Sequence, residues 1–415
     1  MIRKKKFYFI ATLAGILIVT GGCGQKPLTV ADLSNVDQMA LTSESGGTFL
    51  EKDQNSESEN ILMPTSLCAM DKVSNSIICY ATTGKISAEF QAPGIDSSDP
   101  TRIQIIENLA DSTQSPMVVY HAWKPDQALL YSENGNVRAI KETGTFLAVA
   151  GGPASPVIAY SEAAYANGIS YSRMFAGIPK SLVEAEPFFD LEDKTTSLAL
   201  LPVSVESTGE KVKKVWFTQT TWVMGGEDLV YPFNRGLNVF DFATGQIIQI
   251  LDYSRNFKGL SPDHSLAGSM DFNLAGNQSV KIDNLLTGGQ VYFSLDSASD
   301  RGAGNVVFNY DGKLAAWQEA SGSRVVEPST FETRIQLGEI SKGEIIHDIQ
   351  TGELEAVLGW QAVSYINSVG WFNNHLLVIE VRGSSRDAAA LVLFDTKTGK
   401  LTKFCEGSSV GFLYQ

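Results

Sequence analysis

Histidine and cysteine are scarce in this chain of 415 residues, which contains four of each. None of the histidines stands in His-x-x-x-His or His-Glu-x-x-His spacing, which would place two metal ligands on one face of a helix. The sequence therefore excludes a zinc site of that helical type, and it offers no other metal or cofactor motif. His264 and His347 lie beside turn motifs, and we expect them to be loop residues rather than catalysts.

Extended helical periodicity is nearly absent after residue 62. Short runs rich in Val, Ile, Leu, Phe and Tyr alternate there with clusters of Gly, Asn, Asp and Ser, as at residues 117–121, 212–218, 376–381 and 391–394. Many short strands separated by turn residues are typical of a sandwich, a barrel or a propeller. We therefore predict one all-β domain over residues 63–415.

Positive charge is also in short supply. The chain has 32 Lys and Arg against 46 Asp and Glu, which gives a formal net charge of −14. An acidic surface repels the phosphates of nucleic acid and of anionic lipid headgroups. We predict that the protein has no nucleic-acid partner.

The N-terminal segment carries a targeting pattern. Residues 3–6 are basic, residues 7–19 form an apolar run too short to span a membrane comfortably, and small residues lead into Cys23. This pattern resembles the signal peptide and lipobox of bacterial lipoproteins, in which cleavage precedes a cysteine whose sulfur carries a diacylglycerol. The resemblance implies removal of residues 1–22 and a lipidated, palmitate-type anchor on Cys23. Ordinary secretion with a chance cysteine is the alternative.

A lipidated Cys23 would hold the chain on the outer side of the bacterial cell membrane or on the outer membrane, since two or three acyl chains anchor firmly. Residues 23–62 are polar and poor in aromatic residues, so we expect a flexible tether. Cys68 and Cys79 flank a predicted turn. Outside the cytoplasm they can form a cross-strand disulfide, or they can be two small buried apolar residues.

One short phrase, Asp-x-x-Thr-Gly between two apolar strands, recurs along the chain. It occurs at residues 241–245, 348–352 and 395–399, with looser copies at 283–288 and 80–84. A recurrence of roughly 40 to 65 residues indicates an array of similar β units. The aspartates are expected to be structural, because such side chains bond the amides of their own turn.

A second turn recurs before this phrase, with a large apolar residue three places ahead of Asp or Asn. It is found at residues 123–126, 260–263, 308–311 and 371–374. Proline presets φ for such a turn, and Asp or Asn bonds its own backbone there. The large apolar residues are therefore expected to pack between repeated units rather than to bind sugar.

Together these phrases resemble the blades of TolB-like and WD40-like β-propellers. Residues 260–268 and 308–317 are similar to that superfamily's Ser-Pro-Asp-Gly phrase with its following Leu-Ala. The resemblance implies a β-propeller. Counting the repeated units over residues 63–415 predicts seven four-stranded blades, with six or eight as alternatives. The apolar segment at residues 409–415 is expected to complete the first blade and so close the ring.

The sequence favours binding over catalysis. Residues 407–411 match Gly-x-Ser-x-Gly, but a nucleophile elbow needs a following helix and later Asp and His partners, and four residues remain. We assign no catalytic residue and place Trp222 and Trp360 on a possible ligand rim. The prediction is a binding module for a protein, small-molecule or glycan ligand at a propeller face. The alternative is a glycan hydrolase or lyase, or a quinoprotein-like oxidoreductase, with its site in a central funnel.

Overall fold

The chain divides into two compact units, residues 1–42 and 43–415, and all the residues described below belong to the second. The computed structural model describes residues 62–71, 76–95, 103–107, 116–122, 128–153, 155–166, 169–193, 198–221, 234–271, 279–295, 302–321, 331–383 and 388–414. The predicted signal peptide, Cys23 and nearly all of the predicted tether lie outside these ranges. No helix within them has the length and hydropathy needed to cross a membrane.

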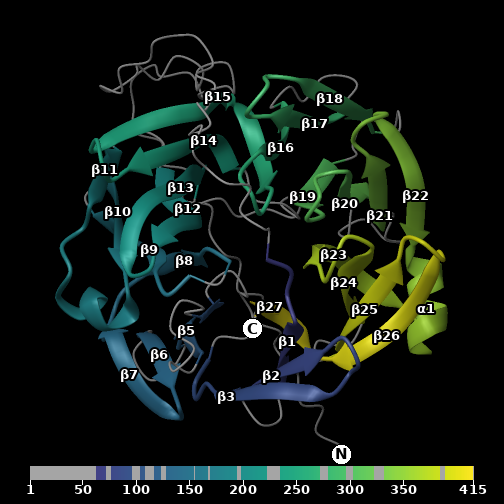
Figure 1. Cartoon of the computed structure of the whole chain (residues 1–415), viewed down its shortest axis with the longest axis horizontal. Coiled ribbons are helices and arrows are strands. Elements are labelled where there is room, and N and C mark those ends of the chain that lie inside the picture. The colour runs from purple at the N-terminus through teal and green to yellow at the C-terminus, as the bar shows by residue number, and fades with distance from the viewer. Residues whose placement is uncertain are drawn as a thin grey trace, which may run out of the picture. The chain divides into compact units, whose positions relative to one another are not determined.

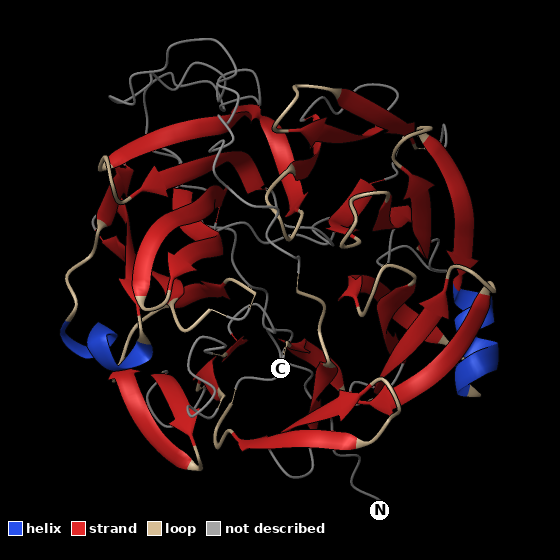
Figure 2. Cartoon of the chain, in the orientation of Figure 1, coloured by secondary structure: helices blue, strands red, loops and turns tan. Residues whose placement is uncertain are grey.

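The described strands form antiparallel sheets that follow one another along the chain (Figures 1 and 2). The first sheet has the order β27-β1-β2-β3 and consists of β1 (Ser66–Asp71), β2 (Ser76–Ala81), β3 (Ile86–Gln91) and β27 (Ser408–Leu413). The second contains β4 (Ile103–Ile106), β5 (Met117–His121), β6 (Leu129–Glu133) and β7 (Asn136–Lys141). The third contains β8 (Phe146–Gly151), β9 (Ile158–Ala166), β10 (Ile169–Gly177) and β11 (Phe189–Asp193), with the 3-10 helix η3 (Pro179–Glu184) before β11.

The remaining strands form one large sheet and two further four-stranded sheets. The large sheet runs from β12 (Leu198–Thr208), β13 (Lys211–Thr221), β14 (Asn234–Asp241) and β15 (Gln246–Leu260) to β16 (Leu266–Asp271), β17 (Ser279–Asn284) and β18 (Gln290–Ser294). The next contains β19 (Gly302–Phe308), β20 (Leu314–Ser321), β21 (Glu332–Glu339) and β22 (Glu344–Gln350). After helix α1 (Thr351–Leu358) come β23 (Val363–Trp371), β24 (Leu376–Gly383), β25 (Ala389–Asp395) and β26 (Lys400–Glu406).

Neighbouring sheets meet through their inner strands. Strand β4 lies against β27 and β8, β8 lies against β12, and β19 lies against β15 and β23. The result is the all-β, propeller-like arrangement that the sequence predicted, and this part of the prediction is confirmed. Apolar residues from adjacent sheets form the core between them, including the fully buried side chains of Trp317 and Trp371. Trp216 is also fully buried, in a cluster formed by the seven-stranded sheet itself.

The predicted number of blades is wrong, because the described residues form five four-stranded sheets rather than seven. The residues expected to give the fourth and fifth blades form a single seven-stranded sheet instead. The cause is β15, whose first half pairs with β14 and whose last residues pair with β16. This 15-residue strand contains no proline, and its one glycine, Gly259, is the residue before its end, so no turn residue lies where the pairing changes from β14 to β16.

Two copies of the Asp-x-x-Thr-Gly phrase form the expected turns between third and fourth strands. The Asp241 carboxylate accepts the amides of Ala243 and Thr244 at 2.7 and 3.1 Å, and the Asp395 carboxylate accepts the Lys397 amide at 3.0 Å. In each turn the final glycine has a φ of 69°, a left-handed value that favours glycine. These aspartates are committed to their own turns, as predicted.

Two other copies of the phrase behave differently, and both expectations are corrected. At residues 283–288 the turn is formed by Asn284, which accepts the amides of Leu286 and Thr287, so that Asp283 is available for another partner. At residues 348–352 there is no turn of this kind, because Asp348 lies inside β22 and Thr351 begins α1. A Gln350–Glu353 capping box starts that helix instead.

The turns with a leading large apolar residue serve as packing points between sheets. The indole Nε1 of Trp371 donates to the carbonyl oxygen of Val307 at 3.2 Å, which joins β23 to the sheet of β19. Phe308 is also buried. The copy at residues 123–126 lies outside the described residues.

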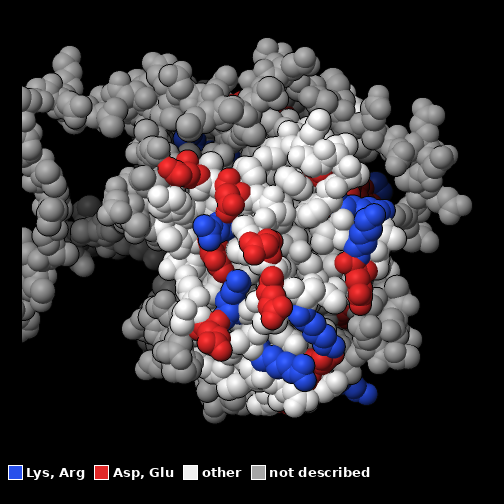
Figure 3. Space-filling view, turned by 90° about the vertical axis from the view of Figure 1, so that its left-hand side faces the viewer, with Lys and Arg blue, Asp and Glu red and all other residues white. Residues whose placement is uncertain are grey.

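Charge is mixed on the surface of the domain. Figure 3 shows acidic and basic side chains interspersed on the face that it presents. Exposed pairs such as Arg173–Asp190 and Lys180–Glu133, each with a closest distance of 3.2 Å, contribute little to stability because water screens them. The described residues of that face therefore form no patch of one sign that would select a strongly charged partner.

Candidate functional site

The structure describes some of the residues that the sequence predicted at functional sites, and others lie outside the described ranges. Cys23 and Trp222 lie outside the described residues. Trp360 follows α1 and is partly buried, and its ring lies beside Gly383 at the end of β24, since a Cβ added there would come within 3.3 Å of it. Arg382 lies over the ring of Tyr365 at 5.8 Å. Trp360, Tyr365 and Arg382 thus occupy one end of the β23–β24 pair, here called the Trp360 surface.

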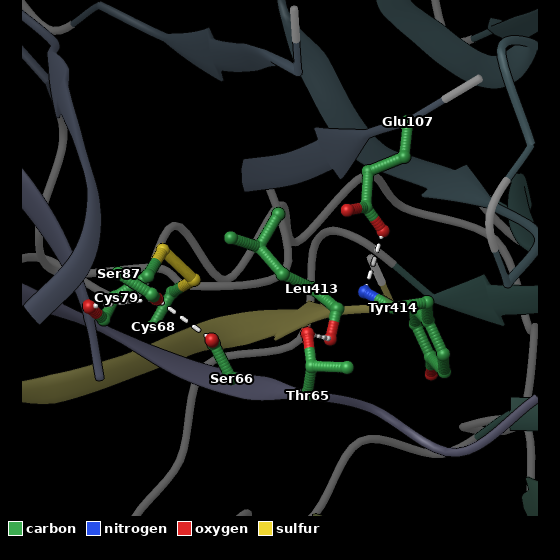
Figure 4. The surroundings of a disulfide bond; sticks show 8 residues. All are labelled: Thr65, Ser66, Cys68, Cys79, Ser87, Glu107, Leu413 and Tyr414. Atoms are coloured by element: carbon green, nitrogen blue, oxygen red, sulfur yellow. Dashed lines mark hydrogen bonds between the residues drawn. A yellow bond between two sulfur atoms is a disulfide. The ribbon is translucent and has the colours of Figure 1, made fainter. Parts of the chain in front are cut away.

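Cys68 and Cys79 lie directly opposite each other in β1 and β2 and form a disulfide (Figure 4). The same part of the first sheet binds the end of the chain, where the Thr65 amide donates to the Leu413 carbonyl at 2.7 Å. Cys405 is a buried thiol, and burial raises its pKa to about 12. Its thiolate is thus almost unpopulated at neutral pH, so Cys405 is a poor nucleophile.

A polar cluster that the sequence did not reveal lies where β12 and β13 meet the turn between β15 and β16. Nε2 of His264 lies 2.9 Å from the Ser204 hydroxyl, and Nδ1 lies 3.4 Å from Oε1 of Glu206. The indole Nε1 of Trp216 donates to the same carboxylate oxygen at 2.6 Å, and its ring stacks on the imidazole at 4.9 Å. We call these four residues the His264 network.

Strand register explains three members of the network. Ser204 and Glu206 are two residues apart in β12 and therefore share a face, and Trp216 and Lys214 lie directly opposite them in β13. A register shift between Pro202 and Ser204 marks a bulge there, a feature that re-aims side chains.

The fourth member is placed by a tight turn. The Ser261 hydroxyl donates to Asp263 at 2.6 Å and accepts the Leu266 amide at 2.8 Å, while the Asp263 carboxylate accepts the Ser265 amide at 3.1 Å. These bonds hold His264 at a φ of 57°, which is uncommon for a residue other than glycine. The turn therefore fixes the imidazole against β12 and β13.

Electrostatics set the state of the imidazole. Burial lowers the pKa of His264, while the nearby Glu206 carboxylate acts in the opposite direction. The ring is therefore mainly neutral at pH 7. The carboxylate favours the tautomer with the proton on Nδ1, which leaves Nε2 to accept the Ser204 hydroxyl proton. The side chains remain 15% (His264) and 28% (Glu206) exposed, so water reaches part of the network.

We expect the network to make stability depend on pH. Because the pKa of His264 is lower in the folded state than in the unfolded chain, protons bind preferentially to the unfolded chain as pH falls below about 6.5. The free energy of unfolding should exceed that of His264→Asn by about 1 kcal/mol or more at pH 7.5. This difference should shrink as pH falls through the folded-state pKa. Urea titrations at pH 7.5 and pH 5 measure it, and a constant or growing difference would contradict the assignment.

Arg255 and Arg334 each form ion pairs across strands of one sheet. Arg255 pairs with Asp283 at 2.6 Å, and Arg334 pairs with Glu319 at 2.7 Å and Asp348 at 3.2 Å. Arg255 on β15 and Asp283 on β17 lie on either side of β16, and the second set spans β20, β21 and β22. Two carboxylates beside an arginine in a central funnel would favour the alternative function, an enzyme. The carboxylates of Glu319 and Asp348 lie instead on β20 and β22, on either side of β21. No metal-binding group of His, Cys, Asp and Glu was found among the described residues.

Comparison with known proteins gives only structural likeness. No protein-family model and no curated protein matches the sequence. An oligogalacturonate lyase from Vibrio parahaemolyticus matches with 10% identity and a TM-score of 0.49, over 83% of this chain and 96% of the lyase. A puromycin hydrolase S511A mutant has 11% identity and a TM-score of 0.47 over 83% of this chain, which spans 52% of the hydrolase.

TolB from Acinetobacter baumannii is also similar, with 12% identity and a TM-score of 0.36 over 83% of this chain and 79% of TolB. Similarity at these levels gives no basis for transferring an activity. The assignment of function therefore depends on the side chains of this protein.

Proposed function

We propose that this protein is a lipid-anchored, extracytoplasmic β-propeller that binds a protein, small-molecule or glycan ligand at the bacterial cell envelope. The observation that carries the proposal is the Trp360 surface, where two partly exposed aromatic rings lie beside Arg382, whose Nε donates to the Glu380 carboxylate at 2.8 Å. Aromatic rings beside arginine supply flat apolar area together with hydrogen-bond donors, a combination enriched at binding sites.

The proposal includes a closed ring of sheets, in which β27 closes the ring as the inner strand of the first sheet. The pairing of β27 with β1 supports closure, as does the bond from the Tyr414 amide to the Glu107 carboxylate at 2.7 Å (Figure 4). A ring without open sheet edges would give a rigid base for a ligand surface.

A ligand screen tests the binding proposal. The intact protein would be applied to arrays of soluble glycans and peptides, and each positive ligand would be titrated against variants. Trp360→Ala should weaken binding by about tenfold or more, because it removes a central aromatic contact. Tyr292→Ala is the matched control, since Tyr292 is a 50% exposed aromatic residue on β18 of another sheet. Equal effects of the two variants, or no ligand at all, would contradict the proposal.

Anchoring is tested separately. If Cys23 carries the lipid, Cys23→Ser should move nearly all of the protein from the membrane fraction to the soluble fraction, because the acyl chains supply the membrane affinity. Metabolic labelling with a fatty-acid analogue should label the wild type and not the variant. Cys405→Ser is the control, and it should stay labelled and membrane-bound. Unchanged membrane association of Cys23→Ser would refute the anchor and leave the ligand result unaffected.

A further inference from the structure

We propose that Ser204, His264 and Glu206 form an acyl-transfer site in which Ser204 is the nucleophile, with small esters as the substrate class. This activity goes beyond ligand binding at the Trp360 surface. It rests on the geometry of the His264 network, which has the order that nucleophilic catalysis needs.

The distances give each side chain one role. The Ser204 hydroxyl and His264 Nε2 are within hydrogen-bond reach at 2.9 Å, and Nδ1 faces the Glu206 carboxylate at 3.4 Å. The imidazole is thus positioned as a base toward the hydroxyl and held in orientation by the carboxylate. Nδ1 cannot serve the hydroxyl instead, because the carboxylate lies on its side of the ring.

Two further groups support the carboxylate. Trp216 donates to Oε1 of Glu206, and the ammonium of Lys214 lies 3.8 Å from Oε2. Both interactions hold the carboxylate in position beside the imidazole. The positive φ of His264 is a second sign of a site, because uncommon backbone conformations concentrate where a side chain must be held in one position.

The reaction balances with water as the only co-reactant. The Ser204 oxygen bonds to the ester carbonyl carbon while its proton moves to Nε2 of His264. The resulting intermediate expels the alcohol, which takes that proton, and the acyl group remains on Ser204. Water then attacks the acyl carbon, gives its proton to Nε2, and restores the serine as the carboxylic acid leaves.

Burial limits the substrate. Ser204 is 9% exposed and lies beside the buried Trp216, so only a small or narrow acyl group can reach its oxygen. The neutral imidazole can accept the proton at pH 7, which suits an uncharged ester. A bulky peptide carbonyl would not fit against β12 without displacing the indole.

A fluorophosphonate probe tests the proposal on the full-length protein. The probe forms an oxygen–phosphorus bond with an activated serine as fluoride leaves, and mass spectrometry locates the modified residue. We expect Ser204 to be modified about a hundredfold faster than Ser254, because a positioned base contributes rate factors of that order. Ser254 is the matched control, since its hydroxyl donates to the Asp252 carboxylate without a histidine.

Variants test whether Ser204 is activated by its neighbours or has only a structural role. Ser204→Ala should abolish labelling and hydrolysis of p-nitrophenyl acetate above the background of the protein. Glu206→Gln should slow labelling by about tenfold or more, since it removes the charge that orients the imidazole. Circular dichroism and thermal melting establish that each variant is folded, and His264→Asn, which tolerates the positive φ, serves if the glutamine variant unfolds.

The pH profile gives an independent readout. Labelling of Ser204 should rise through the pKa of His264, below about 6.5, and level off by pH 7.5. A serine without a base would instead keep reacting faster as hydroxide increases. The proposal is overturned if Ser204 in the folded wild type reacts no faster than Ser254, or if folded His264→Asn labels at the wild-type rate.

Discussion

Deletion of residues 407–415 is expected to unfold the β-domain at room temperature or to lower its free energy of unfolding by more than about 5 kcal/mol. The deletion removes β27, which pairs with β1 through five residues and buries Val410 and Leu413. The deletion also removes a hydrogen-bond donor from each of two buried carboxylates, because Glu380 accepts the Ser409 amide and Glu107 accepts the Tyr414 amide. Unfolding would be followed by urea titration and thermal circular dichroism.

A deletion of similar length provides the control. Removal of residues 51–60 takes out part of the predicted tether and should leave the unfolding midpoint within about 1 °C of the wild type, since no core contact is expected there. If both shortened chains unfold as the wild type does, β27 contributes nothing to the domain, and the proposed closure fails.

Gly259→Ala is expected to destabilise the domain by about 3 kcal/mol or more. A Cβ at Gly259 would lie 1.9 Å from the carbonyl oxygen of Val306, so β15 and β19 could not keep their separation. The carbonyl oxygen of Val306 belongs to the backbone, so it cannot move away by a change of rotamer as a side-chain atom can. Gly268 on β16 is also close to β19, because a Cβ added to it would lie 2.8 Å from the Val306 side chain.

Gly352→Ala is the matched control for that variant. Gly352 lies in the first turn of α1, and an added Cβ would meet nothing within 4 Å. This substitution should be neutral or stabilising by up to about 1 kcal/mol, because alanine is the better helix former. A Gly259→Ala protein as stable as Gly352→Ala in urea titrations would show that the two sheets are not in contact at that point.

The sequence predicted those parts of the fold that depend on neighbouring residues. Turn residues and alternating apolar runs indicated short strands, and the turns at residues 241–245 and 395–399 formed as expected. The same phrase at residues 348–352 did not, because the helix favoured by the Gln350–Glu353 capping box took over at Thr351. Local sequence thus specified a turn only where no competing element was available.

Tertiary partners explain what the sequence could not reveal. Asp283 looked like a turn residue, but the distant Arg255 is its partner and Asn284 forms the turn. The unbroken β15 joins two expected blades, which no turn motif could indicate. Ser204 and His264 are 60 residues apart, and the only local signal was a histidine directly after a Ser-Pro-Asp turn. Pairings of this kind depend on which strands become neighbours.

Strand β27 is an integral part of the first sheet, and the proposed closure of the ring depends on it. Hydrogen exchange followed by mass spectrometry on the intact protein measures this directly. We predict that the amides of β27 exchange as slowly as those of the central strand β24, with a free energy of opening close to that of global unfolding. Exchange of the β27 amides within seconds, while β24 stays protected, would contradict it.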